Sequence, residues 1–475
     1  MKRHLLIVMA VALLGLHALT NGQYGFHRDE LSTLADAASL DWGYVGAPPL
    51  TPFLARVAFA MFGPSLAGLR FFASLAMAVA FVLTGLMARH MGGGRFAQSV
   101  AAVSAAISGV ALSAGALFEY VSLDYLWWVM AAYFVVRLLA SNDARAWLGV
   151  GAAVGLGLMT KYSIVFLMAG IGAGIVFTPA RRYLRSGWLW GGVALAFVIF
   201  LPNLIWQIRH DFVTLDFLRS IHARDVQLGR TDGFLSGQFW IATNSFTVPL
   251  WIAGLVFLFT NEAGRRFRML GWMFVIPLVL FVLAKGRDYY MAPAYPMLLA
   301  AGAVWCERLV KRWLVIVLLA TGGLLWAAPV LPIAPVDSSF WRFADRVNGG
   351  NFNEQIGWPE LAHTVAQIRA TLPAQTGIPV ADTAQAEAID LYAPELPHAI
   401  SVANSHWFRG YGNPPPKPLI VVGFPDAFVQ RHLASCVKAG RVGIENSAIG
   451  GKNVFVCDGP IQPWPRFWQD AKHYG

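Results

Sequence analysis

Long apolar segments alternate with short polar ones from Leu5 to Val330 of this 475-residue chain. A helix that crosses a membrane needs roughly 20 predominantly apolar residues, within a range of about 17–25. Counted at that length, the pattern predicts eleven spans, at residues 4–21, 66–88, 97–114, 121–139, 146–160, 163–178, 188–208, 237–260, 268–284, 290–305 and 312–331. The sequence therefore predicts a polytopic α-helical membrane protein.

Residues 146–178 are the part of this pattern that can be drawn in two ways, as one long helix or as two short ones. A single helix would bury the Lys161 ammonium group in the middle of the membrane, where a charge is costly. It would also invert every later loop. We therefore expect two spans that meet at Thr160-Lys161-Tyr162.

Basic residues concentrate on one side of the predicted membrane, as the positive-inside rule expects of the cytoplasmic side. With Met1 inside, the inner loops hold three acids, Asp143, Glu262 and Glu307, against Lys2, Arg3, Arg89, Arg95, Arg137, Arg145, Arg181, Arg182, Arg185, Arg265, Arg266, Arg268, Arg308, Lys311 and Arg312. The outer loops hold eleven acids and nine basic residues. We expect a cytoplasmic N-terminus. Residues 1–20 also have the pattern of a cleaved signal peptide, but no small-x-small site precedes Asn21, so we expect a retained helix.

Polar residues return after Pro335, and residues 336–475 contain no predicted span. We therefore predict a membrane domain at 1–335, with its first outer loop at 22–65, and an α/β domain at 336–475 on the outer side. Within the second domain the pattern predicts helices at 359–370, 383–392 and 425–434, and strands at 377–381, 418–423 and 453–457.

The chain has three cysteines and no CxxC or His/Cys cluster with zinc spacing. Cys306 lies in an apolar helix, where packing explains it. Cys436 and Cys457 lie in the predicted outer domain, and an oxidising compartment permits a disulfide between them. Two reduced, partly buried thiols are the alternative.

Composition agrees with a membrane protein: 57% of residues are hydrophobic, 13% are charged, and the mean hydropathy is +0.54. The net charge of +10 raises the question of nucleic-acid binding. The basic residues follow the predicted cytoplasmic face, however, where they meet anionic lipid headgroups, and no DNA-reading motif is visible. We therefore exclude nucleic acid as a partner.

The strongest candidates for chemistry are the adjacent acids Asp29 and Glu30, shortly after the first apolar segment. Charges held near lipid are expensive and usually mark a functional site. The predicted topology brings further polar residues to the same outer face: Glu119, Asp124, Lys161, Lys285, Arg287, Asp288, Tyr289 and Tyr290. Transfer from a phosphate-linked donor needs such a set, because a carboxylate accepts the proton of the acceptor and cations stabilise the departing phosphate. Neighbouring carboxylates also shift each other's pKa.

Each candidate has a structural alternative that the sequence leaves open. Acids are favourable in the first turn of a helix, which would explain Asp29, Glu30 and Asp124. Long cationic side chains at a membrane interface reach toward water, which would explain Arg70, Lys161 and Lys285, and aromatic belts would explain Tyr289 and Tyr290. The run Pro48-Pro49-Leu50-Thr51-Pro52 is either a rigid linker or one wall of a groove, and the polar loop 209–236 either covers a site or is only a surface loop.

Several strings resemble those of bacterial glycosyltransferases that use polyprenyl-phosphate sugars, relatives of the dolichyl-phosphate-mannose protein mannosyltransferases and of the lipid A aminoarabinose transferase. The first is Phe26-His27-Arg28-Asp29-Glu30-Leu31, followed by Trp42-Gly43-Tyr44 and Pro48-Pro49-Leu50. The others are Ser122-Leu123-Asp124, Gly157-Leu-Met-Thr160-Lys161-Tyr162 and Lys285-Gly-Arg-Asp-Tyr289-Tyr290-Met-Ala-Pro293-Ala-Tyr-Pro296. They occur in order over residues 1–330, and the tail shares only a general α/β pattern.

The resemblance implies a GT-C fold in the bacterial inner membrane, with a periplasmic site, a sugar donor carried on undecaprenyl phosphate, and inversion at the anomeric carbon. It implies catalytic roles for Asp29, Glu30 and Asp124, with Asp29 as the base or as the group that orients the acceptor. The donor phosphate would be bound by Lys161, Lys285, Arg287, Arg70, Tyr289 and Tyr290. Some relatives bind a divalent metal. No matching ligand set is visible here, so we assign no cofactor and leave a divalent metal open. Lipid A, protein and polysaccharide all remain open as acceptors.

A secondary transporter or lipid flippase is the alternative function. Transporters tend to show inverted repeats and charges or broken helices at mid-membrane. The charges of this chain cluster at one interface, and no internal repeat is visible. A non-catalytic scaffold would leave the ordered acids and lysines unexplained. We therefore expect a membrane glycosyltransferase.

Overall fold

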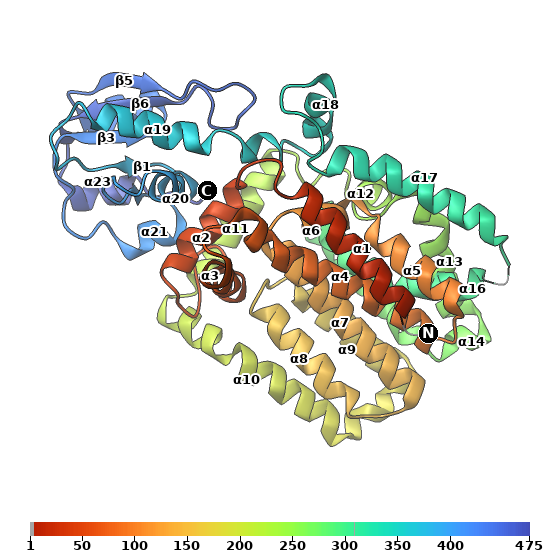
Figure 1. The fold of residues 1–475 in the computed structure, drawn as a ribbon. Helices are drawn as coiled ribbons and strands as arrows, with labels where there is room; N and C mark the ends of the chain where they lie inside the picture. The colour runs from red at the N-terminus through yellow and green to blue at the C-terminus, as the bar shows by residue number, and fades with distance from the viewer. Residues whose placement is uncertain (1–3, 308) are drawn as a thin grey trace.

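The structure, a computed structural model, describes residues 4–307 and 309–475 (Figure 1). Lys2, Arg3 and Arg308 of the predicted cytoplasmic set lie outside the described residues. The first part of the chain is a bundle of helices: α1 (His4–Thr20), α2 (Arg28–Ala38), α3 (Leu50–Phe62), α4 (Leu66–His90), α5 (Arg95–Ala106), α6 (Gly109–Ala116), α7 (Tyr120–Ser141), α8 (Ala146–Leu158), α9 (Ile164–Phe177), η1 (Pro179–Arg185), α10 (Gly187–Arg209), α11 (Val213–Gln227), α12 (Phe234–Trp240), η2 (Ser245–Thr247), α13 (Val248–Thr260), α14 (Glu262–Arg265), α15 (Arg268–Leu283), η3 (Asp288–Ala294), α16 (Tyr295–Cys306) and α17 (Arg312–Val330).

Every apolar segment predicted to span a membrane is helical, but several are bent or broken. The segment 97–114 forms α5 and α6, which meet at 68°, and 237–260 forms α12 and the run from η2 into α13, which meet at 88°. Within the described ranges, four helices are long and apolar enough to cross a membrane: α4, α7, α10 and α17. Three bent pairs raise this number to seven. The chain is therefore a helical membrane protein, and the count of eleven spans stays a prediction.

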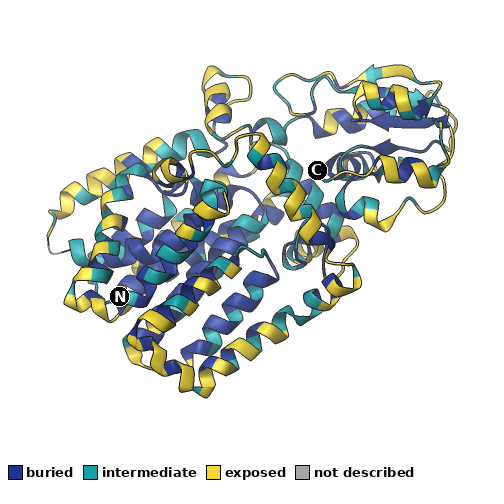
Figure 2. Cartoon of the chain, turned by 180° about the vertical axis from the view of Figure 1, so that it is seen from behind, coloured by how far each residue is buried: buried dark blue, intermediate teal, exposed yellow. Residues whose placement is uncertain are grey.

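Burial separates the centre of the bundle from its surface (Figure 2). Trp128 of α7 and Leu298 of α16 are almost completely buried. In contrast, α10 and α17 expose large apolar side chains, among them Phe197 and Leu324. Exposed apolar surface of this extent marks a contact with a membrane or a partner, and its position on long apolar helices fits lipid.

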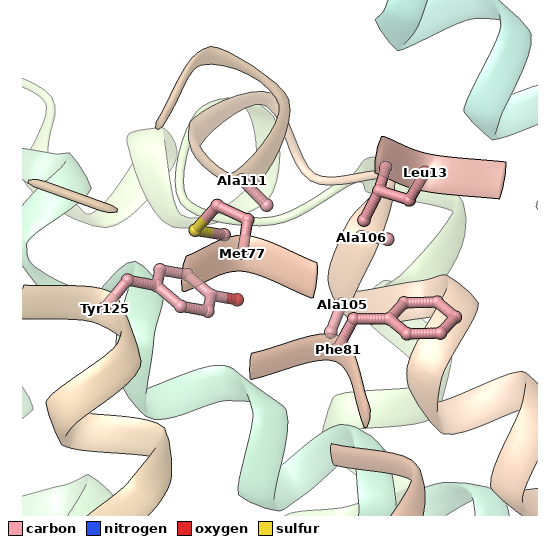
Figure 3. Close-up of a pocket in the computed structure, with 7 residues that line it drawn as sticks. All are labelled: Leu13, Met77, Phe81, Ala105, Ala106, Ala111 and Tyr125. Atoms are coloured by element: carbon pink, nitrogen blue, oxygen red, sulfur yellow. The ribbon is translucent and has the colours of Figure 1, made fainter. Parts of the chain in front are cut away.

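A small apolar pocket lies between α1, α4, α5, α6 and α7 (Figure 3). Its lining residues are Leu13, Met77, Phe81, Ala105, Ala106, Ala111 and Tyr125. The Tyr125 hydroxyl is the one polar side-chain group among them, and no predicted site residue is included. We assign this pocket to helix packing.

The predicted first outer loop contains two helices, α2 and α3. The proline run within it leads into α3, because Pro49 is the N-cap of that helix and Pro52 lies in its first turn. Proline is tolerated there since the first N–H groups of a helix have no partner within it. The role of the run as one wall of a groove stays a prediction. The Leu50 amide donates to the carbonyl oxygen of Met159 at 2.9 Å, which ties α3 to the end of α8.

The tail forms a mixed α/β structure around a five-stranded sheet of order β2-β1-β3-β6-β5, in which β1 is parallel to β2 and β3, and β6 is antiparallel to β3 and β5. Its elements are α18 (Ser339–Val347), η4 (Asn353–Gln355), α19 (Trp358–Arg369), β1 (Pro379–Val380), α20 (Thr383–Tyr392), β2 (Ile400–Ser401), α21 (Asn404–Arg409), β3 (Leu419–Val422), α22 (Asp426–His432), β4 (Leu433–Ala434), β5 (Val437–Arg441), β6 (Asn453–Cys457), β7 (Gly459–Pro460) and α23 (Trp464–Asp470).

The six elements predicted for the tail are all present, with one different end. The helix expected at 425–434 ends at His432, because Leu433 and Ala434 pair with β7. Several tail elements were not predicted: the strand β5, whose residues are mostly exposed, and α18, η4, α21, α23, β2, β4 and β7. Cys436 and Cys457 are joined by a disulfide, as predicted.

The first outer loop and the tail share one apolar core. It contains Leu31 and Leu34 of α2 and Ala55 of α3, together with Leu361 of α19 and Ile389 of α20. All of these side chains are nearly or completely buried. The tail therefore fixes the position of α2, the helix that begins at the Asp29-Glu30 pair.

Candidate active site

The candidate site begins at the N-terminus of α2, where His27 is the N-cap. Its Nδ1 accepts the Asp29 N–H at 3.1 Å, and the Glu30 carboxylate accepts the His27 N–H at 2.8 Å. Such a reciprocal arrangement is a capping box. The capping box fixes the side chains of His27 and Glu30, and both residues are buried. The Asp29 side chain, in contrast, is 46% exposed.

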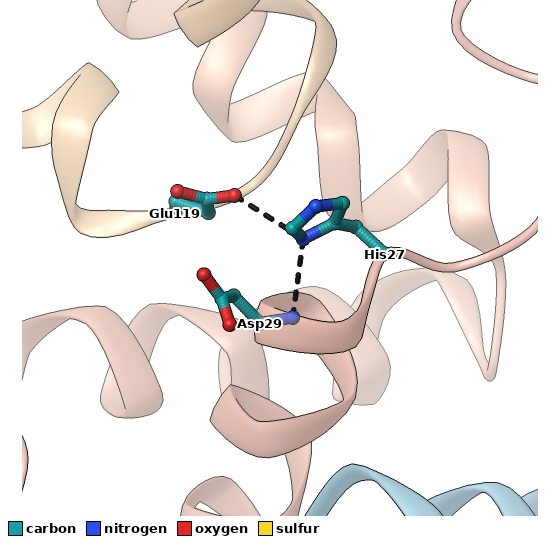
Figure 4. Close-up of side chains that lie close together, drawn as sticks. All are labelled: His27, Asp29 and Glu119. Carbon is teal, nitrogen blue, oxygen red and sulfur yellow. Dashed lines mark hydrogen bonds and ion pairs between the residues drawn. The ribbon is translucent and has the colours of Figure 1, made fainter. Parts of the chain in front are cut away.

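Three side chains converge at this turn: His27, Asp29 and Glu119 (Figure 4). Their nearest ligand atoms all lie within 4.8 Å of one another, and His27 Nδ1 is 3.4 Å from Glu119 Oε1. Glu119 is the N-cap of α7, and its side chain makes no capping hydrogen bond to that helix. The prediction that the first loop and the start of the fourth span share a face is thus met through Glu119.

The electrostatics of this cluster separate its two carboxylates. Partial burial raises the pKa of Asp29, but Arg28 and His27 outweigh it and hold that pKa below its ordinary value. For Glu119, burial and then the nearby Asp29 charge raise the pKa to about 7. Two carboxylates with pKa values pushed apart are suited to different roles in proton transfer. Near neutral pH, Asp29 is therefore ionised and able to accept a proton, whereas Glu119 titrates close to that pH.

His27 lies among three carboxylates. Burial lowers its pKa, but Glu354, Glu119 and Asp29 outweigh burial and raise the pKa to about 9. The two partners of Nδ1 then make opposite demands, because the Asp29 N–H needs a lone pair there and Glu119 needs a proton. The neutral ring caps α2, and the charged ring pairs with Glu119. His27 therefore couples the protonation of the cluster to the start of α2.

Glu30 and Arg70 form a fully buried ion pair, and this corrects two predictions. Glu30 Oε1 and Oε2 accept Arg70 Nε and Nη2, each at 2.8 Å, and both side chains are 0% exposed. The remaining Arg70 N–H groups donate to carbonyl or amide oxygens of Asn21, Gly25 and Gln355. Every nitrogen of the Arg70 guanidinium thus donates to a group inside the protein. Arg70 is not placed to bind a donor phosphate, and Glu30 supports the site only by fixing this turn.

Lys161 lies in a cage of aromatic rings. Its Nζ is 3.9 Å from the Tyr290 ring centroid, 4.4 Å from that of Tyr120 and 5.4 Å from that of Tyr289. Ring faces attract a cation without neutralising it, so the charge remains available to an anion. The Tyr120 hydroxyl is 3.4 Å from the Tyr289 hydroxyl. Because Tyr120 directly follows Glu119, this cage adjoins the Asp29 cluster.

Asp124 lies one turn into α7 and is buried. Its Oδ2 accepts the Ser163 hydroxyl at 3.1 Å, and its Oδ1 has no hydrogen-bond partner among the described residues. Asp124 therefore belongs with the Lys161 segment and not with Asp29. Its predicted catalytic role stays a prediction.

The two remaining predicted cations differ in their surroundings. Arg287 forms a two-pronged pair with Asp225 of α11, at 2.7 Å from Nε and 2.6 Å from Nη2. The polar loop 209–236 is thus bound to the segment that carries Tyr289. Lys285 is exposed and adopts a left-handed backbone conformation (φ 47°) at the end of α15. A role of either in phosphate binding stays a prediction.

The donor set of the cluster does not suit a metal ion as the residues stand. The three ligand atoms are close enough for a divalent cation. However, His27 Nδ1 accepts the Asp29 N–H, and Nε2 lies 3.2 Å from Glu354 Oε2. A metal binds a free lone pair of neutral imidazole, which this ring does not offer. The residues are better suited to hold a proton.

Three contributors to the site were not predicted from the sequence: His27, Tyr120 and Glu354. His27 lies two residues before the predicted acid Asp29. Tyr120 directly follows Glu119, an acid that the predicted topology places on the same face. Both could therefore have been suspected from the sequence. Glu354 lies far away in the predicted second domain and had no such signal. Asp225 belongs to the polar loop that was left open, and its pairing with Arg287 could not be read from spacing.

Comparison with solved structures identifies the architecture. ArnT from Cupriavidus metallidurans in the apo state matches with a TM-score of 0.62 at 16% identity, over 95% of this chain and 97% of that one. Its complex with undecaprenyl phosphate matches with a TM-score of 0.59. The chain has the GT-C fold.

Sequence comparisons agree with this GT-C assignment. Residues 46–206 match the dolichyl-phosphate-mannose-protein mannosyltransferase family. Lipid A galacturonosyltransferase RgtD of Rhizobium johnstonii is 27% identical over 306 residues, 61% of this chain and 63% of that protein. Undecaprenyl phosphate-α-4-amino-4-deoxy-L-arabinose arabinosyl transferase 1 of Pseudomonas fluorescens is 26% identical over 287 residues, 56% of this chain and 51% of that protein. The matches span half to two thirds of these relatives. They confirm the predicted resemblance and favour a transferase over a transporter.

Proposed function

We propose that this GT-C protein is a membrane glycosyltransferase that moves a sugar from a polyprenyl-phosphate carrier to an acceptor on the outer side of the membrane. The observation that carries the proposal is the position of Asp29, an ionised and half-exposed carboxylate beside an aromatic cage that holds the Lys161 charge. A base and a cation on neighbouring turns are what transfer from a phosphate leaving group requires.

The reaction is a single displacement. The acceptor hydroxyl attacks the anomeric carbon, the bond from that carbon to the phosphate oxygen breaks, and the configuration inverts. Asp29 takes the hydroxyl proton, and the electron pair of the broken bond stays on the polyprenyl phosphate. Lys161 stabilises this dianion, with Tyr289 and Tyr290 holding its ammonium group. An acceptor that is itself an ionised phosphate needs no base, and Asp29 would then orient it.

Lipid A is the acceptor that we favour, and an undecaprenyl-phosphate sugar is the donor, because two relatives are named for these molecules. For the chain itself we propose eleven spans with a cytoplasmic N-terminus, and a tail (336–475) in the periplasm. The disulfide supports an oxidising compartment for the tail. The sharing of one core by the tail and α2 supports its place on the same side as Asp29.

The test is sugar transfer by purified protein, with Asp29→Asn compared to Asp232→Asn. Asp232 is an exposed acid in the α11–α12 connection and serves as the matched control. We expect Asp29→Asn to lose at least about 100-fold in kcat, as loss of a general base commonly costs 10²–10⁴, while the protein still accumulates in membranes. Full transfer by Asp29→Asn would refute the mechanism. Movement of substrate across sealed vesicles without consumption of the lipid-linked sugar would refute the function.

A further inference from the structure

The turn η4 of the tail lies directly against the residues that precede α2. A Cβ atom added to Gly25 would stand 2.5 Å from the Gln355 carbonyl oxygen, so the two backbones touch there. The Gln355 side chain accepts from Arg70 Nη2 at 3.1 Å. The neighbouring Glu354 points to the other side of this contact, toward the candidate site.

Glu354 reaches two consecutive residues of the capping turn. Its Oε2 lies 3.2 Å from His27 Nε2, within ion-pair distance although outside hydrogen-bond geometry, and 3.5 Å from Arg28 Nε. Its side chain is 26% exposed, and that of His27 only 3%. Glu354 is thus the carboxylate that faces the imidazole from the side opposite Glu119.

The backbone that carries Glu354 is held in place on both sides. Asp345 Oδ1 accepts the N–H groups of Phe352 at 2.9 Å and Asn353 at 3.0 Å. The Trp358 indole N–H donates to the Glu354 carbonyl oxygen at 2.9 Å. Trp358 itself is buried in the core shared with α2. These contacts fix the backbone of η4 and with it the position of the Glu354 carboxylate.

We propose that Glu354 is a positioning residue of the Asp29 site, through which the tail completes the catalytic turn by holding His27 and Arg28 in place. This proposal rests on the proposed function. Asp29 follows both of these residues in the same turn, and its carboxylate accepts from Arg28 Nε at 3.3 Å. The tail thereby sets the direction and the charge of the Asp29 carboxylate without touching the substrate.

The charges around His27 define what removal of Glu354 does. The ring is faced by Asp29 of α2, by Glu119 before α7 and by Glu354 of η4. Glu354 is one of the carboxylates that raise the pKa of His27 to about 9. Without its charge, the imidazolium loses its proton at a lower pH, and the cation beside Asp29 is lost earlier on the alkaline side. The charged ring is the state that pairs with both Glu119 and Glu354, so loss of its proton releases the turn that carries Asp29. Activity should therefore decline at a lower pH than in the unmodified protein.

The variants are Glu354→Gln, which keeps shape and removes charge, and Glu354→Asp, which keeps charge. Glu360→Gln is the matched control, because Glu360 is an exposed acid on the adjacent α19. For Glu354→Gln we expect kcat to fall about tenfold, the loss of one charged contact, with the KM for the lipid-linked donor within about twofold. The alkaline limb of the pH profile should move down by about one pH unit. Glu354→Asp should restore most of both, and Glu360→Gln should change neither.

Hydrogen exchange of the apo protein gives a readout that does not depend on catalysis. In Glu354→Gln, amides of residues 24–34 should exchange about tenfold faster, with no change in Glu360→Gln. Unmodified protein that transfers sugar, together with a Glu354→Gln variant that keeps kcat, pH profile and exchange, would overturn this proposal and leave the function standing. If Glu354→Gln exchanges faster but the unmodified protein transfers no sugar, the proposed glycosyltransferase function is overturned and the contact of Glu354 with the His27 turn still stands. A Glu354→Gln variant that is slow at all pH values alike, and is not rescued by Glu354→Asp, would reduce Glu354 to a folding role and also overturn the proposal.

Discussion

The substitution Glu30→Gln separates the two adjacent acids by what they do. The Glu30 carboxylate accepts four N–H groups, from Arg70 Nε and Nη2 and from the backbones of His27 and Phe118, all at 2.8 Å. A glutamine has one oxygen and would turn its NH₂ group toward N–H donors. Arg70, 0% exposed, would remain as an uncompensated buried charge. Breaking a buried pair from one side costs about 3–5 kcal/mol.

That loss is a large share of the roughly 5–15 kcal/mol that stabilises a folded protein. At about 2 °C per kcal/mol for a large chain, the thermal midpoint in detergent should fall by roughly 6–10 °C. The assay is size-exclusion chromatography after heating, at one fixed heating time because unfolding is read as a rate. Glu395→Gln, an exposed acid of the tail, is the control and should melt as the unmodified protein does.

A double-mutant cycle sharpens this test. Glu30→Met/Arg70→Met removes both charges, and we expect it to cost less than the sum of the single changes by about 2 kcal/mol or more, because neither charge is left alone. Asp29→Asn should melt within about 2 °C of the unmodified protein. The reasoning fails if Glu30→Gln keeps its melting point and loses sugar transfer as Asp29→Asn does. Glu30 would then act in catalysis.

Three further outcomes follow from the contacts. The pKa of His27 is raised from 6.5 to about 9. Its contribution to stability is therefore complete below pH 6.5 and is lost as the pH rises through 9. The melting point should fall between pH 6.5 and 9, and the variant His27→Gln should show a smaller fall over this range. Lys161→Met should lower kcat/KM by about 10²-fold, since it removes charge stabilisation of the leaving phosphate. The control Lys311→Met should leave kcat/KM unchanged. Steady-state kinetics of sugar transfer measure both. The double variant Cys436→Ser/Cys457→Ser should destabilise the tail by about 3 kcal/mol. In the unmodified protein, denatured but not reduced, a thiol assay should label neither Cys436 nor Cys457.

The sequence was informative where chemistry and local pattern coincide. Apolar runs located the helices, and the scarcity of charge made Asp29 and Lys161 conspicuous. Sequence order could not show that Glu30 and Arg70 face each other, because residues 40 positions apart meet only in the folded chain. For the same reason, the adjacent acids Glu30 and Asp29 differ in the structure. Glu30 is buried in an ion pair with Arg70, and Asp29 is partly exposed.

The tail was the part that the sequence described least completely. Its strands could be located from short apolar runs, but no local pattern connects Glu354 with His27. The connection arises from the shared core of α2, α19 and α20, and such a core is a property of three-dimensional packing. Bends within the predicted spans were also missed, since hydropathy registers apolar length and not direction.

The core shared by α2 and the tail has a consequence for how the protein is made. Leu31 leaves the ribosome about 330 residues before its partner Leu361. At about 5–20 residues per second, synthesis of the intervening chain takes roughly 20–60 s. During that time the turn at the start of α2 has no tail to pack against. Under the proposed function, the nascent chain is therefore inactive until α19 and α20 have packed against α2.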